Sequence, residues 1–345
     1  MHRSSGFRRG LLLLAVLAGF VLVPAAAQAD PSFYDSPLFG LATAPDGSLL
    51  VADYPNGIVD GDTGALVAAL PEVQDIAPRE HGKLWAITSG ADPTVSSNQS
   101  LYSVEGGVAT QVAYLFAFEE ANNPHPTAVD SNPFDVVDLG GGKALVADAG
   151  GNDLLRVDSH GNIELIAVLP DELVSTDNIK HLAGCPDSHS EFCDLPHELP
   201  AQLVATSVAV GPDGAYYMGE LKGFPAPTGA SRIWRIDPDA QGARCGESPQ
   251  CTVVFDCFTS IIDLAFGPDG KLYVAQIDDA SWAAIEIFEG EGALGGSVHA
   301  CDLSGGCEEV VDEIPILTAI TFRDGHLWGT VSALIPGETD AVPIA

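Results

Sequence analysis

The sequence predicts an all-β protein, a six-bladed β-propeller with four-stranded blades and inserted rim loops. The first observation is a hairpin pattern that occurs six times, two apolar runs joined by a turn such as Pro-Asp-Gly. The second is composition: the 345 residues include 37 Gly and 24 Pro, and only 18% are charged, which is typical of turn-rich β proteins. The third is spacing, because successive turn glycines lie 35 to 72 residues apart, enough for one blade plus insertions.

The six hairpins follow one another along the chain. The pattern is clearest in residues 206–218, where the turn Pro-Asp-Gly separates two runs of alternating apolar residues. The equivalent hairpins span residues 41–53, 76–88, 136–148, 264–276 and 320–330. One hairpin buries only one face of its sheet, whereas six sheets around an axis cover one another. The repeats therefore predict a closed ring.

Weaker strand pairs follow the hairpins and predict the outer half of each blade, as in residues 154–158 with 163–168 and residues 233–236 with 252–255. The sixth repeat offers only residues 341–344. We therefore expect residues 32–37 to add an outer strand there and close the ring. Long insertions, at about 119–132 and 171–200, interrupt the repeats and are expected on the rim, where binding usually occurs.

The first 29 residues predict a secretory signal peptide. Arg3, Arg8 and Arg9 precede an apolar run over residues 11–23, and Ala-Gln-Ala at 27–29 forms a cleavage box. The propeller would then occupy residues 30–345 of a secreted or extracytoplasmic protein, in the periplasm or cell envelope. A retained anchor is the alternative, although the run is short for a membrane span. The Arg8-Arg9 pair leaves twin-arginine and general secretory export both open.

The charge is strongly acidic. The chain has 14 basic and 48 acidic residues, and loss of the three arginines of the signal peptide leaves a net charge of about −37. Such a surface repels phosphate backbones and anionic lipid heads, so we expect no nucleic-acid partner and no membrane span after signal cleavage. It suits solubility, a cationic ligand or a divalent ion such as calcium. We expect a monomer.

Seven cysteines in an exported chain predict disulfides. Two pairs share a C-x5-C spacing around a hairpin loop, and a third pair lies in the long insertion; the predicted bridges are Cys245–Cys251, Cys301–Cys307 and Cys185–Cys193. Cys257 is left over and is expected to be a small buried apolar residue. The insertion also places His181, His189 and His197 in register with its cysteines, which leaves a zinc or copper site as the alternative, although two prolines break any helix there.

Polar residues close the second strand of several hairpins. Equivalent strand ends of a propeller meet at one mouth of the channel, so these side chains could hold a ligand or cation there; the predicted rim residues are Asp53, Asp148, Asn152, Glu220 and Gln276, with Asp148 and Glu220 as the metal candidates. The structural alternative is that the Asp and Asn residues tie down the following turns while Arg156 bridges between blades.

Several segments carry a family resemblance. Residues 132–137 (Asn-Pro-Phe-Asp-Val-Val), 146–155 and 206–225, above all Gly-Glu-Leu-Lys-Gly-Phe-Pro at 219–225, resemble the ScyD/ScyE family of exported propellers, which is similar to NHL-repeat and SMP-30/gluconolactonase-like propellers. The resemblance implies an extracytoplasmic six-bladed propeller. If the resemblance extends to the lactonases, it implies a metal ion bound by Glu, Asn and Asp side chains, for which Glu220, Asn152 and Asp148 are the nearest candidates.

The sequence names no catalytic residue. It contains no G-x-S-x-G elbow, no H-E-x-x-H motif, no P-loop and no dinucleotide fingerprint. We therefore expect a non-enzymatic propeller that binds a small molecule, a peptide or an envelope protein through its rim loops. The alternative is a metal-dependent hydrolase of the lactonase type, in which Glu220 and Asp148 would hold a calcium or zinc ion.

Overall fold

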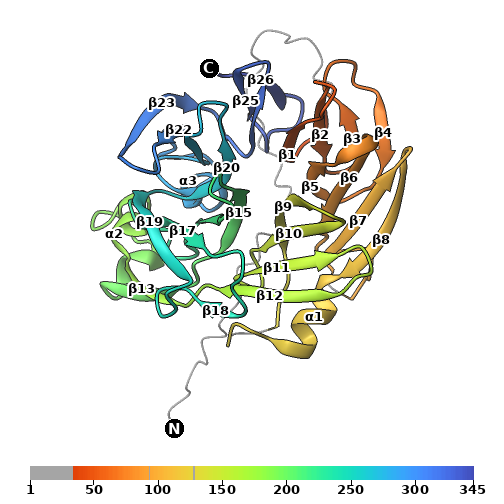
Figure 1. The fold of residues 1–345 in the computed structure, drawn as a ribbon. Coiled ribbons are helices and arrows are strands. Elements are labelled where there is room, and N and C mark those ends of the chain that lie inside the picture. Colours follow the sequence, from red (N-terminus) through yellow and green to blue (C-terminus); the bar gives the residue numbers. More distant parts are fainter. Residues whose placement is uncertain (1–33, 93, 127–128) are drawn as a thin grey trace.

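Six antiparallel sheets surround a central axis in the computed structural model, which describes residues 34–92, 94–126 and 129–345 (Figure 1). The protein is therefore a six-bladed β-propeller, as predicted. The strands of the first three blades, from the axis outwards, are β1 (Leu38–Thr43), β2 (Leu49–Asp53), β3 (Gly57–Asp60) and β4 (Leu66–Ala69); β5 (Val73–Pro78), β6 (Lys83–Thr88), β7 (Ser100–Glu105) and β8 (Val108–Tyr114); and β9 (Pro133–Gly140), β10 (Lys143–Asp148), β11 (Asp153–Asp158) and β12 (Ile163–Val168).

The other three blades continue the pattern. Their strands are β15 (Ala205–Val210), β16 (Tyr216–Glu220), β17 (Ser231–Ile236) and β19 (Cys251–Phe258); β20 (Ile261–Phe266), β21 (Leu272–Gln276), β22 (Gly296–Cys301) and β23 (Cys307–Ile314); and β24 (Ile320–Arg323), β25 (His326–Val331) and β26 (Asp340–Pro343). A short strand, β18 (Ala243–Arg244), pairs in parallel with β12 and covers the outer edge of blade 3.

The turn chemistry explains the hairpins. In blade 4, Gly214 has a φ of 78°, a conformation that favours glycine, and the carboxylate of Asp213 accepts a hydrogen bond of 3.1 Å from the backbone N–H of Ala215. The two strands then pair from Val210 with Tyr216 towards Ala205 with Glu220. The inner two strands are buried almost throughout because neighbouring blades cover both of their faces.

The long connections gather on one face of the ring. Strands of a blade alternate in direction, so the connections from second to third strand and from blade to blade share one face, called here the insertion face. It carries α1 (Leu115–Asn122), α3 (Trp282–Glu286) and the segment 171–201, which holds β13 (Glu172–Ser175), α2 (Asp177–Leu182), η2 (Glu191–Asp194) and β14 (Glu198–Ala201). The opposite turn face carries mostly tight hairpin turns, with η1 (Glu80–Gly82) and the longer loop 237–250.

Blade 6 contains the strand expected near residues 341–344 but departs from the prediction in its outer strand. It has three strands in the described part of the chain, and the third, β26, comes from the C-terminal residues. Residues 34–37 form no strand, and the rest of the predicted N-terminal strand lies outside the described residues. The ring is joined instead by Leu38, whose N–H donates to the carbonyl of Ala333 at 3.0 Å, and by Arg323, which makes two hydrogen bonds to Asp62 at 2.6 and 2.7 Å.

The three predicted disulfides are present, namely Cys185–Cys193, Cys245–Cys251 and Cys301–Cys307. Cys185 and Cys193 of the insertion are therefore bonded to each other, as predicted, and do not serve as the metal ligands of the alternative. The prediction for Cys257 was wrong, because its side chain is exposed. It lies in a bulge of β19, between the pairs Ser231–Phe258 and Ile233–Phe255, where its backbone φ of 70° leaves the regular strand conformation.

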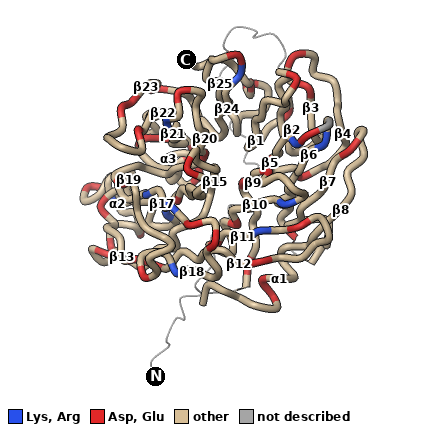
Figure 2. Tube along the Cα trace, viewed as in Figure 1, with Lys and Arg blue, Asp and Glu red and all other residues tan. Residues whose placement is uncertain are grey.

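Acidic positions occur around the whole ring, and basic ones are far fewer (Figure 2). Most of the basic side chains are engaged in ion pairs with neighbouring carboxylates, as Lys83 is with Glu105 and Lys271 with Glu308. Within the described residues, no helix has the length and apolar character needed to cross a membrane.

Candidate functional site

The predicted rim residues lie in one layer on the insertion face. Asp53, Asp148, Glu220 and Gln276 each pair with the first residue of their blade's inner strand. Their side chains are not open to solvent, since all four and Asn152 have exposed fractions of 5% or less. What each can bind is therefore decided by its neighbours inside the protein.

Asp148 and Asn152 organise the connection between β10 and β11. One carboxylate oxygen of Asp148 accepts hydrogen bonds from the backbone N–H groups of Asn132, Gly150 and Gly151 at 2.7 to 3.0 Å, and the other accepts one from the Ser131 hydroxyl. Asn152 Oδ1 accepts from the N–H of Val204 at 2.9 Å, which fixes the end of the long insertion to blade 3. These contacts match the structural alternative.

Arg156 makes the bridge that this alternative expected. It pairs with Glu164 in its own blade and donates to the carbonyl of Pro238, in blade 4, at 3.1 Å.

Glu220 belongs to a buried ion network. Its two oxygens lie 2.7 Å from Lys222 Nζ and 2.7 Å from the donating Trp234 Nε1. Lys222 is fully buried and also lies 3.2 Å from Glu172, which makes two hydrogen bonds with Arg232. Burial raises the pKa of Glu220, and Lys222 opposes that rise. The Lys222 ammonium group thus already supplies the positive charge that a metal at Glu220 would bring.

Asp53 and Gln276 are also engaged locally. Asp53 accepts a hydrogen bond from Asn56 at 3.0 Å, and burial raises the pKa of its carboxyl group. Gln276 accepts from the N–H of Thr259 and donates to Asp279 and Ser297. Among the described residues, no three His, Cys, Asp or Glu side chains come together in an arrangement that could hold a metal ion.

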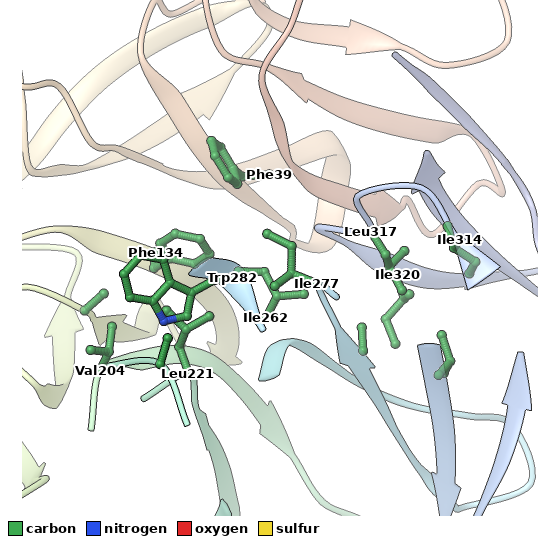
Figure 3. Packing of buried hydrophobic residues seen from close by; sticks show 14 of the residues in the cluster. Phe39, Phe134, Val204, Leu221, Ile262, Ile277, Trp282, Ile314, Leu317 and Ile320 are labelled. Carbon is green, nitrogen blue, oxygen red and sulfur yellow. The ribbon is translucent and has the colours of Figure 1, made fainter. Parts of the chain in front are cut away.

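Apolar side chains fill the axis at the level of the insertion face. Phe39 and Phe134, which project from the bulged inner strands of blades 1 and 3, meet edge to face with ring centroids 5.5 Å apart. Trp282 of α3 packs in the same cluster beside Phe134 and Leu221 (Figure 3). Its Nε1 donates to the carbonyl of Lys222 at 2.8 Å. This cluster, called here the apolar plug, joins side chains of blades 1, 3 and 5.

Three inner-strand carboxylates, which sequence reasoning missed, lie at the next level of the inner strands. Asp75, Asp135 and Asp263 each accept a hydrogen bond of 2.6 to 2.9 Å from a backbone N–H of the following inner strand. The side chains of Asp75 and Asp135 also share a hydrogen bond. Each carboxylate therefore joins two blades.

A recurrent sequence signal could have identified these carboxylates. Asp75, Asp135 and Asp263 occupy the same position of their inner strands, each followed by an aliphatic residue. The equivalent position in blade 1 is Gly40, where a Cβ would lie 2.5 Å from Asp75 Oδ1.

Stability should fall as the pH rises. Burial, and then the charge of Asp135, raises the pKa of Asp75. Burial raises the pKa of Asp135 to about 6. Burial, and then the charge of Asp135, also raises the pKa of Asp263. Between the pKa of these carboxyl groups in the unfolded chain and their higher pKa in the folded protein, the folded protein binds more protons than the unfolded chain. The stabilisation is therefore complete below the unfolded-state pKa and is lost as the pH rises through the folded-state pKa. We expect the free energy of unfolding to decrease from pH 5 to 8 by roughly 1.4 kcal/mol per pH unit for each extra bound proton.

The Asp75→Asn variant tests this expectation. Asparagine can accept from Val136 and donate to Asp135 without titrating, so urea denaturation should show a shallower pH dependence and higher stability at pH 8 than in the wild type. The exposed Asp187→Asn variant should keep the wild-type slope. An unchanged slope in Asp75→Asn would contradict the assignment.

The insertion face also carries a hollow of about 420 Å³ within the long insertion. It is lined by the Cys185–Cys193 disulfide, Pro186 and the polar side chains of Asp177, Lys180 and His181. The insertion is held in place by Asn178, whose Nδ2 donates to the carbonyls of Ala226 and Ala280, in the loops of blades 4 and 5. The hollow therefore lies in a segment that is hydrogen-bonded to the loops of blades 4 and 5.

Comparison with known proteins supports the fold alone. No family model and no curated protein matches the chain. Among solved structures, it is similar to virginiamycin B lyase from Staphylococcus aureus, with 14% identity, a TM-score of 0.50, and coverage of 90% of this chain and 85% of that one. It is also similar to a putative oxidoreductase (glucose dehydrogenase) from Thermus thermophilus, with 16% identity, a TM-score of 0.52, and coverage of 92% and 99%.

Proposed function

We propose that this protein is an exported, non-enzymatic propeller of the ScyD/ScyE type, whose insertion-face loops bind a small molecule, a peptide or a cell-surface partner. The observation that carries the proposal is the asymmetry of the ring: α1, α3 and the 171–201 segment share one face, while the other carries mainly hairpin turns. Loops on a rigid scaffold are the usual place for binding. Three disulfides suit an oxidising compartment.

A peptide or protein segment suits this face better than an enclosed metabolite. Small-molecule sites are usually enclosed and mainly apolar, whereas the hollow in the insertion is open to solvent, and Asp177, Lys180 and His181 line it beside the disulfide and Pro186. The apolar plug fills the axis beneath. The lactonase-type alternative gains no support at Glu220, because Lys222 already neutralises that carboxylate.

Two matched surface variants test the proposal. Asp187→Ala/His189→Ala/Glu191→Ala alters exposed residues of the insertion, and Asp239→Ala/Asp269→Ala alters exposed residues of the turn face. The immobilised mature protein and both variants are incubated with solubilised cell envelope from the producing organism, and each captured species is quantified. We expect the insertion variant to lose at least about fivefold of specific capture, which corresponds to about 1 kcal/mol, and the turn-face variant to retain it. Equal capture by both variants would argue against a binding site on the insertion face.

A further inference from the structure

Two buried carboxylates face each other beneath helix α1. Glu119 belongs to α1 and is 1% exposed, and Asp153 begins β11 and is fully buried. They meet beside the backbone of Gly151: a Cβ there would lie 3.2 Å from both Asp153 Oδ1 and the carboxyl carbon of Glu119. Asp148 is close enough for its charge to act on both.

These carboxylates lack the donors that buried acidic groups require. Apart from one hydrogen bond that the two carboxyl groups share, both oxygens of Asp153 and Oε1 of Glu119 have no donor, in contrast to Asp148, whose oxygens accept four hydrogen bonds. No ion pair in the described part of the chain joins a Lys or Arg to any of the three. A buried charge without a partner is strongly unfavourable, so a positive species is needed here.

A single proton only partly meets this need. Burial, followed by the charge of Asp148, raises the pKa of Glu119 to about 8, and burial with the Glu119 charge raises the pKa of Asp153. One proton shared between Glu119 and Asp153 still leaves a negative charge beside Asp148. Asp130 adds another acidic group, with a pKa that burial and the Asp148 charge raise to about 6. A divalent cation would balance this charge more completely.

The ligand chemistry favours calcium. The available atoms are carboxylate oxygens, which bind hard cations, and Ca²⁺ accepts six to eight oxygen ligands in flexible geometry, including backbone carbonyls and water. Glu119 and Asp153 would supply two ligand groups, with carbonyls and water as the remainder. Among the described residues, no three such side chains enclose a metal by themselves, so backbone carbonyls and water would have to complete the coordination.

We propose that Glu119 and Asp153 bind a calcium ion that fastens helix α1 to blade 3. The site goes beyond the proposed partner binding, and its ligands differ from the Asp148 and Glu220 pair predicted from the sequence. Helix α1 precedes blade 3 in the chain and is connected to it through residues 123–132. The bound ion would join the buried face of α1 to the start of β11 and so hold the helix against the blade. Calcium availability would thus set the order of this part of the insertion face.

Calcium titration of the mature protein tests this site. After dialysis against EDTA, melting temperature is measured by calorimetry with added CaCl₂ or MgCl₂, for the wild type, Glu119→Gln and Glu120→Gln, the last altering an exposed neighbour on the same helix. We expect calcium at about 100 times its Kd to raise the melting temperature of the wild type and Glu120→Gln by about 5 °C. Glu119→Gln should lose this shift.

Direct calcium binding keeps the test valid if Glu119→Gln folds poorly. Isothermal titration of the wild type should then give one high-affinity site, which Asp153→Asn should also remove. The proposal is overturned if calcium leaves the wild type unchanged, if Glu119→Gln keeps the shift, or if Glu119→Gln is more stable than wild type in both EDTA and calcium. The last result would identify a shared proton in place of the ion.

Discussion

Replacement of Lys222 by methionine should destabilise the protein by about 3–5 kcal/mol. Methionine fills most of the space but leaves Glu220 buried without the ammonium group now 2.7 Å away. Glu172 also loses a contact of 3.2 Å, which ties β13 of the long insertion to blade 4. The free energy of unfolding, measured by urea denaturation at pH 7, should fall by this amount.

Two further variants separate a buried ion pair from a general charge effect. Lys222→Met/Glu220→Gln should recover most of the lost stability, because glutamine is neutral and its side-chain oxygen can still accept from Trp234 Nε1. Arg235→Met breaks a pair with Asp213 that is about one third exposed, so it should cost less than about 1 kcal/mol. Equal losses in Lys222→Met and Arg235→Met would refute the special role of the buried network.

Replacement of Trp282 by alanine should also cost about 3–5 kcal/mol, because it empties the centre of the apolar plug. The indole is 5% exposed and packs with Phe134 and Leu221 at the axis of the ring. Trp282→Phe keeps much of the volume but leaves the Lys222 carbonyl without its donor, so it should cost about 1–3 kcal/mol. Chemical denaturation measures both.

A variant on the same connection supplies the control. Leu294 lies in the loop that carries α3 but is 64% exposed, so Leu294→Ala should change stability by no more than about 0.5 kcal/mol. If Trp282→Ala behaved like Leu294→Ala, the plug would not contribute to the stability of the ring.

The hairpins and disulfides could be predicted because their signals are local. A Pro-Asp-Gly turn between alternating apolar runs determines a hairpin within about twelve residues, as at Gly214, and Cys245 and Cys251 frame one short loop. The closure of blade 6 could not be predicted in this way. It depends on contacts such as Arg323 with Asp62 and Leu38 with Ala333, whose partners lie far apart in the sequence.

The candidate site shows the same division. The sequence placed Asp148 and Glu220 at equivalent strand ends, and each pairs with the first residue of its blade's inner strand. It could not reveal that Lys222 would neutralise Glu220 or that backbone N–H groups would surround Asp148. Those contacts arise where loops from different repeats meet.

By itself, the sequence determined the number of blades, the turns, the disulfides and the acidic character, because each follows from neighbouring residues or from composition. Only the tertiary structure decided which carboxylates are neutralised, which join adjacent blades and which, like Glu119 and Asp153, face each other without a donor from any other residue. The physical reason is that the energy of a buried charge depends on the groups around it in space, and in a ring those groups come from distant repeats.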